Sequence, residues 1–348
     1  MMTLHIQHDI PLAPLTTLEL GGPAKYLARV QNESTLVEAL RWAAERDVKA
    51  VVLAGGSNLI VPDRGYDGLV VQMAISKVAF RDGGGVEAGA GAPWETVVEG
   101  AVARGWAGLE CLTGIPGSTG ATPIQNVGAY GQEVAEVIAA VRVLRRDTLA
   151  FEELGADDCG FGYRDSLFKR EPDRFIVSAV RLALRPGGRG TVRYAELEKQ
   201  VGSDATLGEI RRAVRDLRRS KSMILEPDDP NRRSAGSFFL NPIVTAAESE
   251  RIVELAVREN RAPTPADVPR YPLRNGQVKL AAGWLIEKAG IEKGTRRGAI
   301  GVSSNHALAL VHHGGGTTAE LLALADEIRT RVREQFGVEL EQEPRLLS

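Results

Sequence analysis

The segment that most constrains the fold is residues 113–131, TGIPGSTGATPIQNVGAYG. Its glycines, prolines and small hydroxyl side chains show no helical period, so we expect a long loop. A second glycine-rich stretch, Gly55-Gly56-Ser57-Asn58, directly follows the apolar run 50–54. Such loops commonly present backbone N–H groups to phosphate, because a residue without Cβ lets the chain approach the anion closely. The residues alone leave two interpretations open: ordinary turns, or a site for a dinucleotide pyrophosphate.

The standard nucleotide and hydrolase fingerprints are absent. Gly89-Ala90-Gly91 begins like the Rossmann motif but lacks its third glycine, and no P-loop or H-E-x-x-H motif occurs. Pro116-Gly-Ser-Thr-Gly120 misses the nucleophile-elbow pattern at its first residue. Kinase-like, zinc-protease and serine-hydrolase functions are therefore disfavoured.

Composition excludes further classes. The 348 residues suffice for about two or three domains, and 43 basic against 45 acidic residues argue against a nucleic-acid-binding surface. Cys111 and Cys159 form neither a disulfide framework nor a C-x-x-C metal motif. We find no leader-like start and no apolar run near the ~18–20 residues of a membrane span. We expect a cytoplasmic monomer with no metal site and no membrane insertion.

Periodicity predicts alternating strands and helices. Strands are expected at 26–30, 50–54, 69–73, 86–92, 139–144, 174–184 and 307–311. Helices are expected after Thr35-x-x-Glu38, from Pro93 to Arg104, and at 207–221, 246–259, 280–289 and from Thr317. The Pro227–Pro230 stretch is the best candidate for a linker, which places a major boundary near 215–230.

Several blocks, in order along the chain, are recognisable. They are Gly55-Gly56-Ser57-Asn58, IPGSTGATPIQNVGAYG (115–131), FGYRDSLFK (161–169), AGSFFLNP (235–242), KLAAGWLIEKAG (279–290) and LEQEPR (340–345). Together they resemble the UDP-N-acetylenolpyruvoylglucosamine reductase family, from about Leu15 onward. Members of this family reduce UDP-N-acetylglucosamine enolpyruvate to UDP-N-acetylmuramate for peptidoglycan, and so serve cell-wall biogenesis, cell shape and cell division.

The resemblance implies an α+β fold with non-covalent FAD and with NADPH as co-substrate. The FAD-binding fold would be of the vanillyl-alcohol-oxidase (PCMH) kind in two subdomains, 1–67 and 68–218. A C-terminal α+β substrate-binding domain would follow at 219–348. Flavoproteins of this kind hold the pyrophosphate with loops, which is consistent with the absent Rossmann motif.

The resemblance also implies contacts, position by position. The residues that match the cofactor contacts are Ala54, Gly55, Gly56, Ser57, Asn58, Leu59, Pro116, Gly117, Ser118, Gly120, Ala121, Thr122, Gln125, Asn126, Gly128, Ala129 and Val177. The residues that match substrate contacts are Tyr130, Tyr194, Arg218, Lys221, Asn241 and His306. Tyr194 matches the mobile-loop tyrosine that closes over the sugar nucleotide in one class of the family. The basic cluster 211–221 would face the diphosphate, although any one of its arginines could equally belong to a solvated helix face.

Three residues match the catalytic positions of the family. Arg164 would stabilise the developing carboxylate charge of the intermediate, because its planar guanidinium is permanently charged. Ser237 would donate the proton, although a hydroxyl is a weak acid at neutral pH. Glu343 would assist Arg164 or hold a proton near the intermediate, and Glu341 is the competing assignment if the frame slips. Without the resemblance, Arg164 would be interpreted as a surface ion pair and Gly236-Ser237 as a turn.

Two other functions remain to be weighed. An oxidase of the same flavoprotein superfamily often tethers FAD through His or Cys near the first glycine loop, and neither residue type occurs between Lys49 and Ile60. A flavin or sugar-nucleotide binding module without catalysis would tolerate loss of the three catalytic matches, and all three are present. The reductase is therefore the leading hypothesis.

Overall fold

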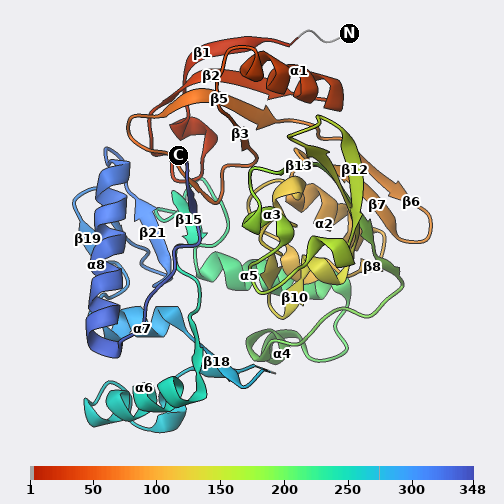
Figure 1. The fold of residues 1–348 in the computed structure, drawn as a ribbon. Helices are drawn as coiled ribbons and strands as arrows, with labels where there is room; N and C mark the ends of the chain where they lie inside the picture. Colours follow the sequence, from red (N-terminus) through yellow and green to blue (C-terminus); the bar gives the residue numbers. More distant parts are fainter. Residues whose placement is uncertain (1–3, 274) are drawn as a thin grey trace. The chain divides into compact units, whose positions relative to one another are not determined.

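The computed structural model describes residues 4–273 and 275–348, and these form two compact units (Figure 1). The first unit contains residues up to Ile10, Ala24–Gly56 and Tyr66–Leu225. The second contains Pro11–Pro23, Ser57–Gly65 and Glu226–Ser348. Two short N-terminal segments, 11–23 and 57–65, thus fold with the C-terminal third of the chain, so each unit is built from segments that are not consecutive in the sequence. The subdomain boundaries at 67/68 and 218/219 stay a prediction, and residues 1–3 of the first range lie outside the described residues.

The first sheet of the first unit has the strand order β1-β2-β5-β3. Its strands are β1 (Ile6–Pro11), β2 (Pro23–Val30), β3 (Ala50–Leu53) and β5 (Tyr66–Met73). β2 and β3 both pair parallel with β5, and helix α1 (Glu33–Ala44) makes the connection between them. Parallel neighbours need a crossover of this kind, so the expected β-α-β opening is confirmed.

The second sheet of the first unit has the order β12-β11-β13-β7-β6. Its strands are β6 (Val78–Arg81), β7 (Gly85–Gly89), β11 (Ile138–Arg145), β12 (Phe151–Gly155) and β13 (Phe175–Ala183). Every pairing in it is antiparallel. The strand expected at 174–184 corresponds to β13, where burial alternates only in the second half, because Phe175, Ile176, Val177 and Ser178 are all buried on this central strand.

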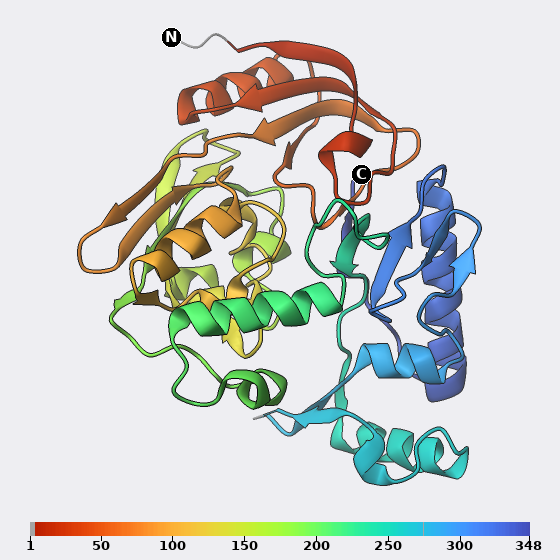
Figure 2. The ribbon, with the colours of Figure 1, turned by 180° about the vertical axis from the view of Figure 1, so that it is seen from behind.

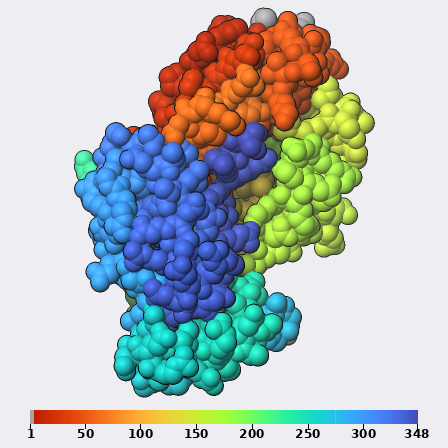
Figure 3. Space-filling model, turned by 60° about the vertical axis from the view of Figure 1, so that its left-hand side comes forward, coloured from red at the N-terminus to blue at the C-terminus, as the bar shows by residue number. Residues whose placement is uncertain are grey.

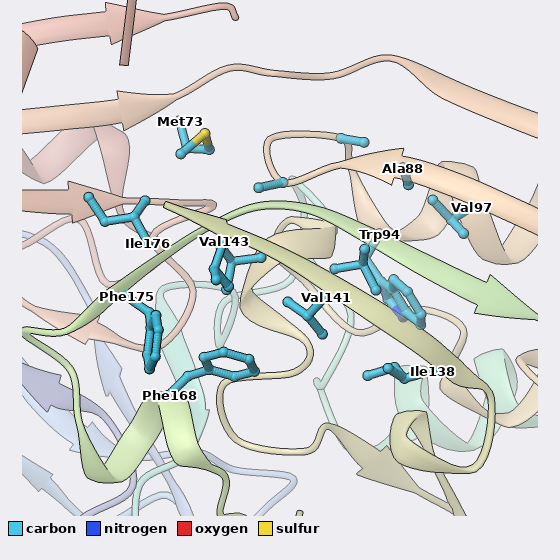
Figure 4. Packing of buried hydrophobic residues seen from close by; sticks show 14 of the residues in the cluster. Met73, Ala88, Trp94, Val97, Ile138, Val141, Val143, Phe168, Phe175 and Ile176 are labelled. Carbon is cyan, nitrogen blue, oxygen red and sulfur yellow. The ribbon is translucent and has the colours of Figure 1, made fainter. Parts of the chain in front are cut away.

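A single hydrophobic cluster joins both sheets and their helices within the first unit. Figure 4 shows Met73 of β5, Ala88 of β7 and Val141 and Val143 of β11 in it, together with Trp94. Trp94 is the first residue of helix α2 (Trp94–Ala103), and its indole N–H donates to the carbonyl of Leu112 at 2.9 Å. The core thereby fixes the point at which the long glycine-rich loop begins, directly after Leu112.

Helix α5 (Leu207–Ser220) and several short elements complete the first unit. Helix α5 packs against α2, and both are seen in Figure 2 as the long green helix and the tan helix beside it. The other elements are helices α3 (Leu167–Arg170) and α4 (Ala195–Val201) and strands β8 (Trp106–Ala107), β9 (Gly128–Ala129), β10 (Gln132–Glu133) and β14 (Arg185–Pro186). No helix in the described part of the chain is long and apolar enough to cross a membrane.

The second unit is also α+β. Its sheets have the orders β15-β21-β20-β19, β16-β18-β17 and β22-β4. The strands are β4 (Leu59–Ile60), β15 (Ser234–Ser237), β16 (Ile243–Thr245), β17 (Arg270–Pro272), β18 (Gln277–Leu280), β19 (Arg296–Arg297), β20 (Ile300–Val302), β21 (Ala309–His312) and β22 (Arg345–Leu346). The helices are α6 (Ala246–Arg258), α7 (Ala282–Lys288) and α8 (Thr318–Phe336). In Figure 3 most of the visible surface of this unit is formed by its C-terminal part, coloured blue.

Helix α8 illustrates how local signals produced a correct prediction. Thr317 caps it as expected, since its hydroxyl accepts from the backbone N–H of Glu320 and that carboxylate binds back to Thr317. The apolar positions with helical spacing on α8 are buried against Leu18, Leu20 and Ile60 of the two N-terminal segments. The capping prediction for α1 was wrong by one turn: Asn32 is the N-cap and Thr35 is its N3 partner.

Candidate active site

The two glycine-rich loops meet within the first unit. A Cβ built on Gly55 would lie 2.6 Å from the Cα of Gly117 and 3.0 Å from the backbone nitrogen of Ser118. Since these neighbours are backbone atoms, only glycine fits at position 55 without displacing the second loop. The sequence predicted two separate phosphate-type loops, and the fold brings the Gly55 and Gly117 positions of these loops into direct contact.

The second loop is fastened to the end of β7 and the start of α2. The backbone N–H of Thr119 donates to Ala92 at 2.8 Å and that of Gly120 to Ala90 at 2.9 Å, while Trp94 donates to Gly117 at 3.1 Å. A Cβ on Gly120 would lie 2.4 Å from the Cβ of Ala90. The loop is therefore held by main-chain bonds to a buried core and is not a flexible connection.

Ser118 supplies the clearest sign that the loop is built to bind a ligand. It is 5% exposed, and its hydroxyl has no hydrogen-bond partner among the described residues. A buried hydroxyl without a partner is costly, so such a group calls for an explanation such as a bound ligand. Together with the close Gly55–Gly117 approach, it fits a loop that holds the pyrophosphate of FAD.

Asn126 organises the far end of the same loop. It has a positive φ of 41°, and its side-chain nitrogen donates to Glu133 at 2.8 Å and to the carbonyl of Gly162 at 3.0 Å. Its side-chain oxygen accepts from the backbone N–H of Ala135 at 3.1 Å. Asn tolerates this left-handed backbone better than most residues. Asn126 thus ties the loop to the segment that carries Arg164.

The other predicted cofactor residues fall in both units. Those in the first unit are Ala54, Gly56, Pro116, Ala121, Thr122, Gln125, Gly128 and Ala129, with Val177 buried on β13. Ser57, Asn58 and Leu59 belong to the second unit. There the side-chain amide of Asn58 donates to the backbone carbonyl of Glu343 at 3.4 Å, and the backbone carbonyl of Asn58 accepts from the backbone N–H of Arg345 at 3.1 Å.

Arg164 is held in an unusual backbone conformation beside the loop. Its φ is +52°, and the ammonium of Lys169 donates to its carbonyl at 2.9 Å. Its guanidinium donates to the carbonyls of Gly128 at 2.5 Å and Asn126 at 3.3 Å. Positive φ in a residue of this size is rare and is found mainly where the surroundings enforce it, often at functional sites. Lys169 ends the recognisable block 161–169, but the sequence assigned it no role.

The predicted substrate residues of the first unit cluster together. The rings of Tyr130 and Tyr194 meet edge to face, 5.4 Å between centroids. Burial raises the pKa of Tyr130 to about 12 against an opposing effect of the nearby Arg218. Burial lowers the pKa of Arg218 to about 10, while Tyr130 and Glu95 act to raise it. Arg218 therefore remains charged at neutral pH and donates to the carbonyls of Gly114 and Met223 at 3.2 and 2.7 Å.

The basic face of α5 is engaged mainly by carboxylates. Arg211 and Arg215 contact Glu95 at 2.8 and 3.0 Å, and Lys221 contacts Glu196 at 2.6 Å. Burial acts to raise the pKa of Glu95, but bonds from the Gly114 N–H and from Arg211 outweigh it and lower the pKa. Arg211 and Arg215 are thus paired with Glu95, and the expectation that the cluster 211–221 faces a diphosphate stays a prediction. The sequence did not single out Glu95.

Ser237 and Glu343 lie on neighbouring segments of the second unit. Ser237 ends β15, opposite Ala309 of β21. The backbone N–H of Glu343 donates to the carbonyl of Phe238, the residue after Ser237, at 2.9 Å. Glu341, the alternative candidate for the catalytic glutamate, pairs with a later residue: its backbone carbonyl accepts from the N–H of Leu240. This register places the backbone of Glu343 nearer to Ser237 than that of Glu341.

The two remaining substrate residues have local structural partners. The side-chain oxygen of Asn241 accepts from the N–H of Ala282, the first residue of α7, at 2.9 Å. The Nδ1 atom of His306 accepts from the N–H of Leu308 at 3.2 Å. Both belong to the second unit, with Ser237 and Glu343, whereas Arg164, Tyr130, Tyr194, Arg218 and Lys221 belong to the first. Among the described residues, no group of His, Cys, Asp and Glu side chains could hold a metal ion.

Comparisons with known proteins define the class and then the family. The FAD binding domain family matches residues 24–149, the part of the chain that contains both glycine loops. The protein is thus an FAD-dependent oxidoreductase of α+β fold, as the sequence predicted. A second model, UDP-N-acetylenolpyruvoylglucosamine reductase, C-terminal domain, matches residues 228–347.

Full-length relatives bear the same name. UDP-N-acetylenolpyruvoylglucosamine reductase from Thermobifida fusca is 44% identical over 99% of this chain and 98% of its own, and that from Saccharopolyspora erythraea is 46% identical over 97% and 94%. The crystal structure of the reductase from Thermus caldophilus matches with a TM-score of 0.67 and 27% identity over 100% of both chains. The chain belongs to the UDP-N-acetylenolpyruvoylglucosamine reductase family.

Proposed function

We propose that the protein reduces UDP-N-acetylglucosamine enolpyruvate to UDP-N-acetylmuramate with NADPH, a step in the synthesis of peptidoglycan precursors. The observation that carries this proposal is the family match over nearly the whole chain, and the sequence contains Arg164, Ser237 and Glu343 at the positions that resemble the catalytic ones. We further propose that it acts as a cytoplasmic monomer. Two buried free cysteines, Cys111 and Cys159, are consistent with a reducing compartment.

The proposed cofactor site uses main chain and small side chains. Gly55, Gly117 and Ser118 would hold the pyrophosphate of FAD, since they combine a close backbone approach with an unsatisfied buried hydroxyl. When bound, FAD supplies the hydride that reduces the carbon–carbon double bond of the substrate. The protein then has to stabilise the charge that develops and deliver a proton to the adjacent carbon.

Arg164 is proposed to stabilise that charge. The enolpyruvyl double bond is conjugated with a carboxylate, so hydride addition at the terminal carbon pushes electron density onto the carboxylate oxygens. A planar guanidinium, permanently charged, suits this enediolate-like group. The bonds from the Arg164 guanidinium to the Gly128 and Asn126 carbonyls hold the side chain in a defined position before substrate arrives, and the bond from Lys169 to the Arg164 carbonyl holds its backbone.

Ser237 is proposed to deliver the proton, with Glu343 acting nearby. A serine hydroxyl is a poor acid, so the transfer requires a strongly basic carbon or a network that lowers its cost. Glu343 would supply part of that network. Its backbone is tied to Phe238 and to Asn58, a residue of the first glycine loop that belongs to the second unit.

Anaerobic half-reactions test the assignment. NADPH should bleach the yellow protein, and the enolpyruvyl sugar nucleotide should restore the colour. Ser237→Ala should leave bleaching unchanged and slow the return of colour by several orders of magnitude. Ser249→Ala is the matched control, because this serine is also buried in the second unit but lies on α6, outside the residues proposed for the site. Failure of the sugar nucleotide to reoxidise the wild-type flavin would contradict the proposed function, and rapid reoxidation by oxygen alone would favour an oxidase.

A further inference from the structure

Tyr130 sits at the tip of a tight hairpin formed by β9 and β10. Gln132 pairs with Ala129 and Glu133 with Gly128, which leaves Tyr130 and Gly131 as the two turn residues. Their φ angles are +50° and +81°, as a two-residue hairpin turn of type I′ requires. Tyrosine is an unusual residue for that position, so the turn is maintained by its surroundings rather than by its own preference.

A buried polar network holds the base of this hairpin. The carboxylate of Glu110, which is fully buried, accepts from the N–H groups of Gly108 and Thr191, each at 2.7 Å, and from the amide of Gln132 at 3.1 Å. The same Gln132 nitrogen donates to the hydroxyl of Thr191 at 3.1 Å. The Gln132 oxygen accepts from the N–H of Cys111 at 3.0 Å. Every polar atom of the Gln132 side chain is thus committed.

The network connects the two segments that carry the tyrosines. Gln132 lies in the hairpin of Tyr130, and Thr191 lies shortly before Tyr194, which is the N-cap residue of α4. A second contact at the protein surface joins the same segments: Arg193 donates to the carbonyl of Gly131 at 3.2 Å and to Glu136 at 3.0 Å. The edge-to-face contact of the two rings therefore depends on bonds made at the base of each segment.

We propose that Glu110, Gln132 and Thr191 are positioning residues that set the place of Tyr194, and with it the affinity for the sugar nucleotide. This inference rests on the proposed role of Tyr194 in covering the substrate. Glu110 is the common acceptor, Gln132 fixes the hairpin to it, and Thr191 fixes the Tyr194 segment to both. Buried polar groups that are fully satisfied specify one arrangement, because any other would leave a donor or acceptor unpaired.

Thr191 offers a pair of nearly isosteric variants. Thr191→Val keeps the shape and the backbone bond to Glu110 but removes the hydroxyl that Gln132 contacts, whereas Thr191→Ser keeps the hydroxyl. We expect Thr191→Val to raise KM for the enolpyruvyl sugar nucleotide about tenfold, the effect of one neutral buried hydrogen bond, and Thr191→Ser to remain close to wild type. The rate of anaerobic bleaching by NADPH should change less than about twofold in either, because the tyrosine segment acts on the sugar nucleotide.

Gln132→Met is the second variant, and it should raise the same KM further. Ile328→Val, a core truncation on α8 in the second unit, controls for a general loss of stability and should alter thermal unfolding but not KM. Amide hydrogen exchange at 188–194 should become faster in Thr191→Val and Gln132→Met and stay unchanged in Ile328→Val.

The outcomes separate this inference from the proposed function. If the sugar nucleotide fails to reoxidise wild-type flavin, the proposed function fails. If wild type turns over but Thr191→Val and Thr191→Ser have equal KM values, or if Thr191→Val slows both half-reactions alike, the positioning role is refuted.

Discussion

Replacing Gly55 by alanine tests the idea that the two glycine loops form one cofactor site. The added Cβ would lie 2.6 Å from the Cα of Gly117, 2.9 Å from its carbonyl carbon and 3.0 Å from the nitrogen of Ser118. Ordinary van der Waals contact begins at 3.4 Å, so one loop must move by several tenths of an ångström. No flexible side chain is available to yield, because all three neighbours are backbone atoms.

The expected magnitude follows from this geometry. Overpacking of a tight contact costs about 1–3 kcal/mol. If the loops separate to relieve it, the Gly117–Ser118 backbone leaves the position suited to the pyrophosphate. A loss of that size corresponds to a roughly five- to 150-fold weaker affinity for FAD. The φ of Gly55 is not positive, so the cost comes from the clash and not from backbone strain.

Fluorescence titration of the deflavinated protein with FAD measures the effect. Gly208→Ala is the matched control, since a Cβ there would meet no atom within 4 Å and the residue lies in helix α5. Its FAD affinity should equal that of wild type, with thermal stability unchanged or raised, because alanine is favoured over glycine in a helix by about 0.5–1 kcal/mol. Wild-type FAD affinity in Gly55→Ala would refute the view that this close approach shapes the site.

Two further predictions concern the carboxylates of Glu343 and Glu33. Glu343→Gln should slow the reoxidation of the flavin by the sugar nucleotide by at least about tenfold, whereas Glu341→Gln should leave that rate within about twofold of wild type. Equal effects of the two variants would contradict the assignment of Glu343. The pKa of Glu33 is lowered in the folded protein, mainly because Arg142 donates to its carboxylate, and Ser178 donates as well. Glu33 therefore stabilises the fold above its unfolded pKa of about 4.5, and this stabilisation is lost as the pH falls through the lower folded pKa. Thermal unfolding between neutral and acid pH should therefore show a smaller loss in Arg142→Met than in wild type, and an equal loss would remove Glu33 as a contributor.

Much of the element structure could be predicted because its causes are local. Helix α8 is specified by the Thr317–Glu320 capping box and by apolar residues at helical spacing. Helix α2 follows the same logic, with Pro93 before it and Arg104 at its end. The glycine loops were recognisable for a similar reason, since backbone that must approach another chain or an anion closely excludes a Cβ.

Long-range pairings could not be predicted from such patterns. The Glu95 carboxylate binds Arg211 and Arg215 from α5, and nothing near Glu95 in the sequence announces those partners. Likewise, residues 57–65 pack with the C-terminal part of the chain, although Ser57 and Asn58 belong to the first glycine loop and directly follow Gly55 and Gly56. Contacts between distant segments depend on how sheets and helices stack, which periodicity does not encode.

The sequence by itself determined the cofactor class, the family and the identity of the candidate residues, because these depend on side-chain types in a fixed order. Only the tertiary structure decided that Gly55 touches Gly117, that Glu343 pairs beside Ser237, and that Glu110 links the two tyrosine segments. The physical reason is that hydrogen bonds and close contacts act over a few ångströms in space. Residues far apart along the chain reach that distance only once the cores of the two units have formed.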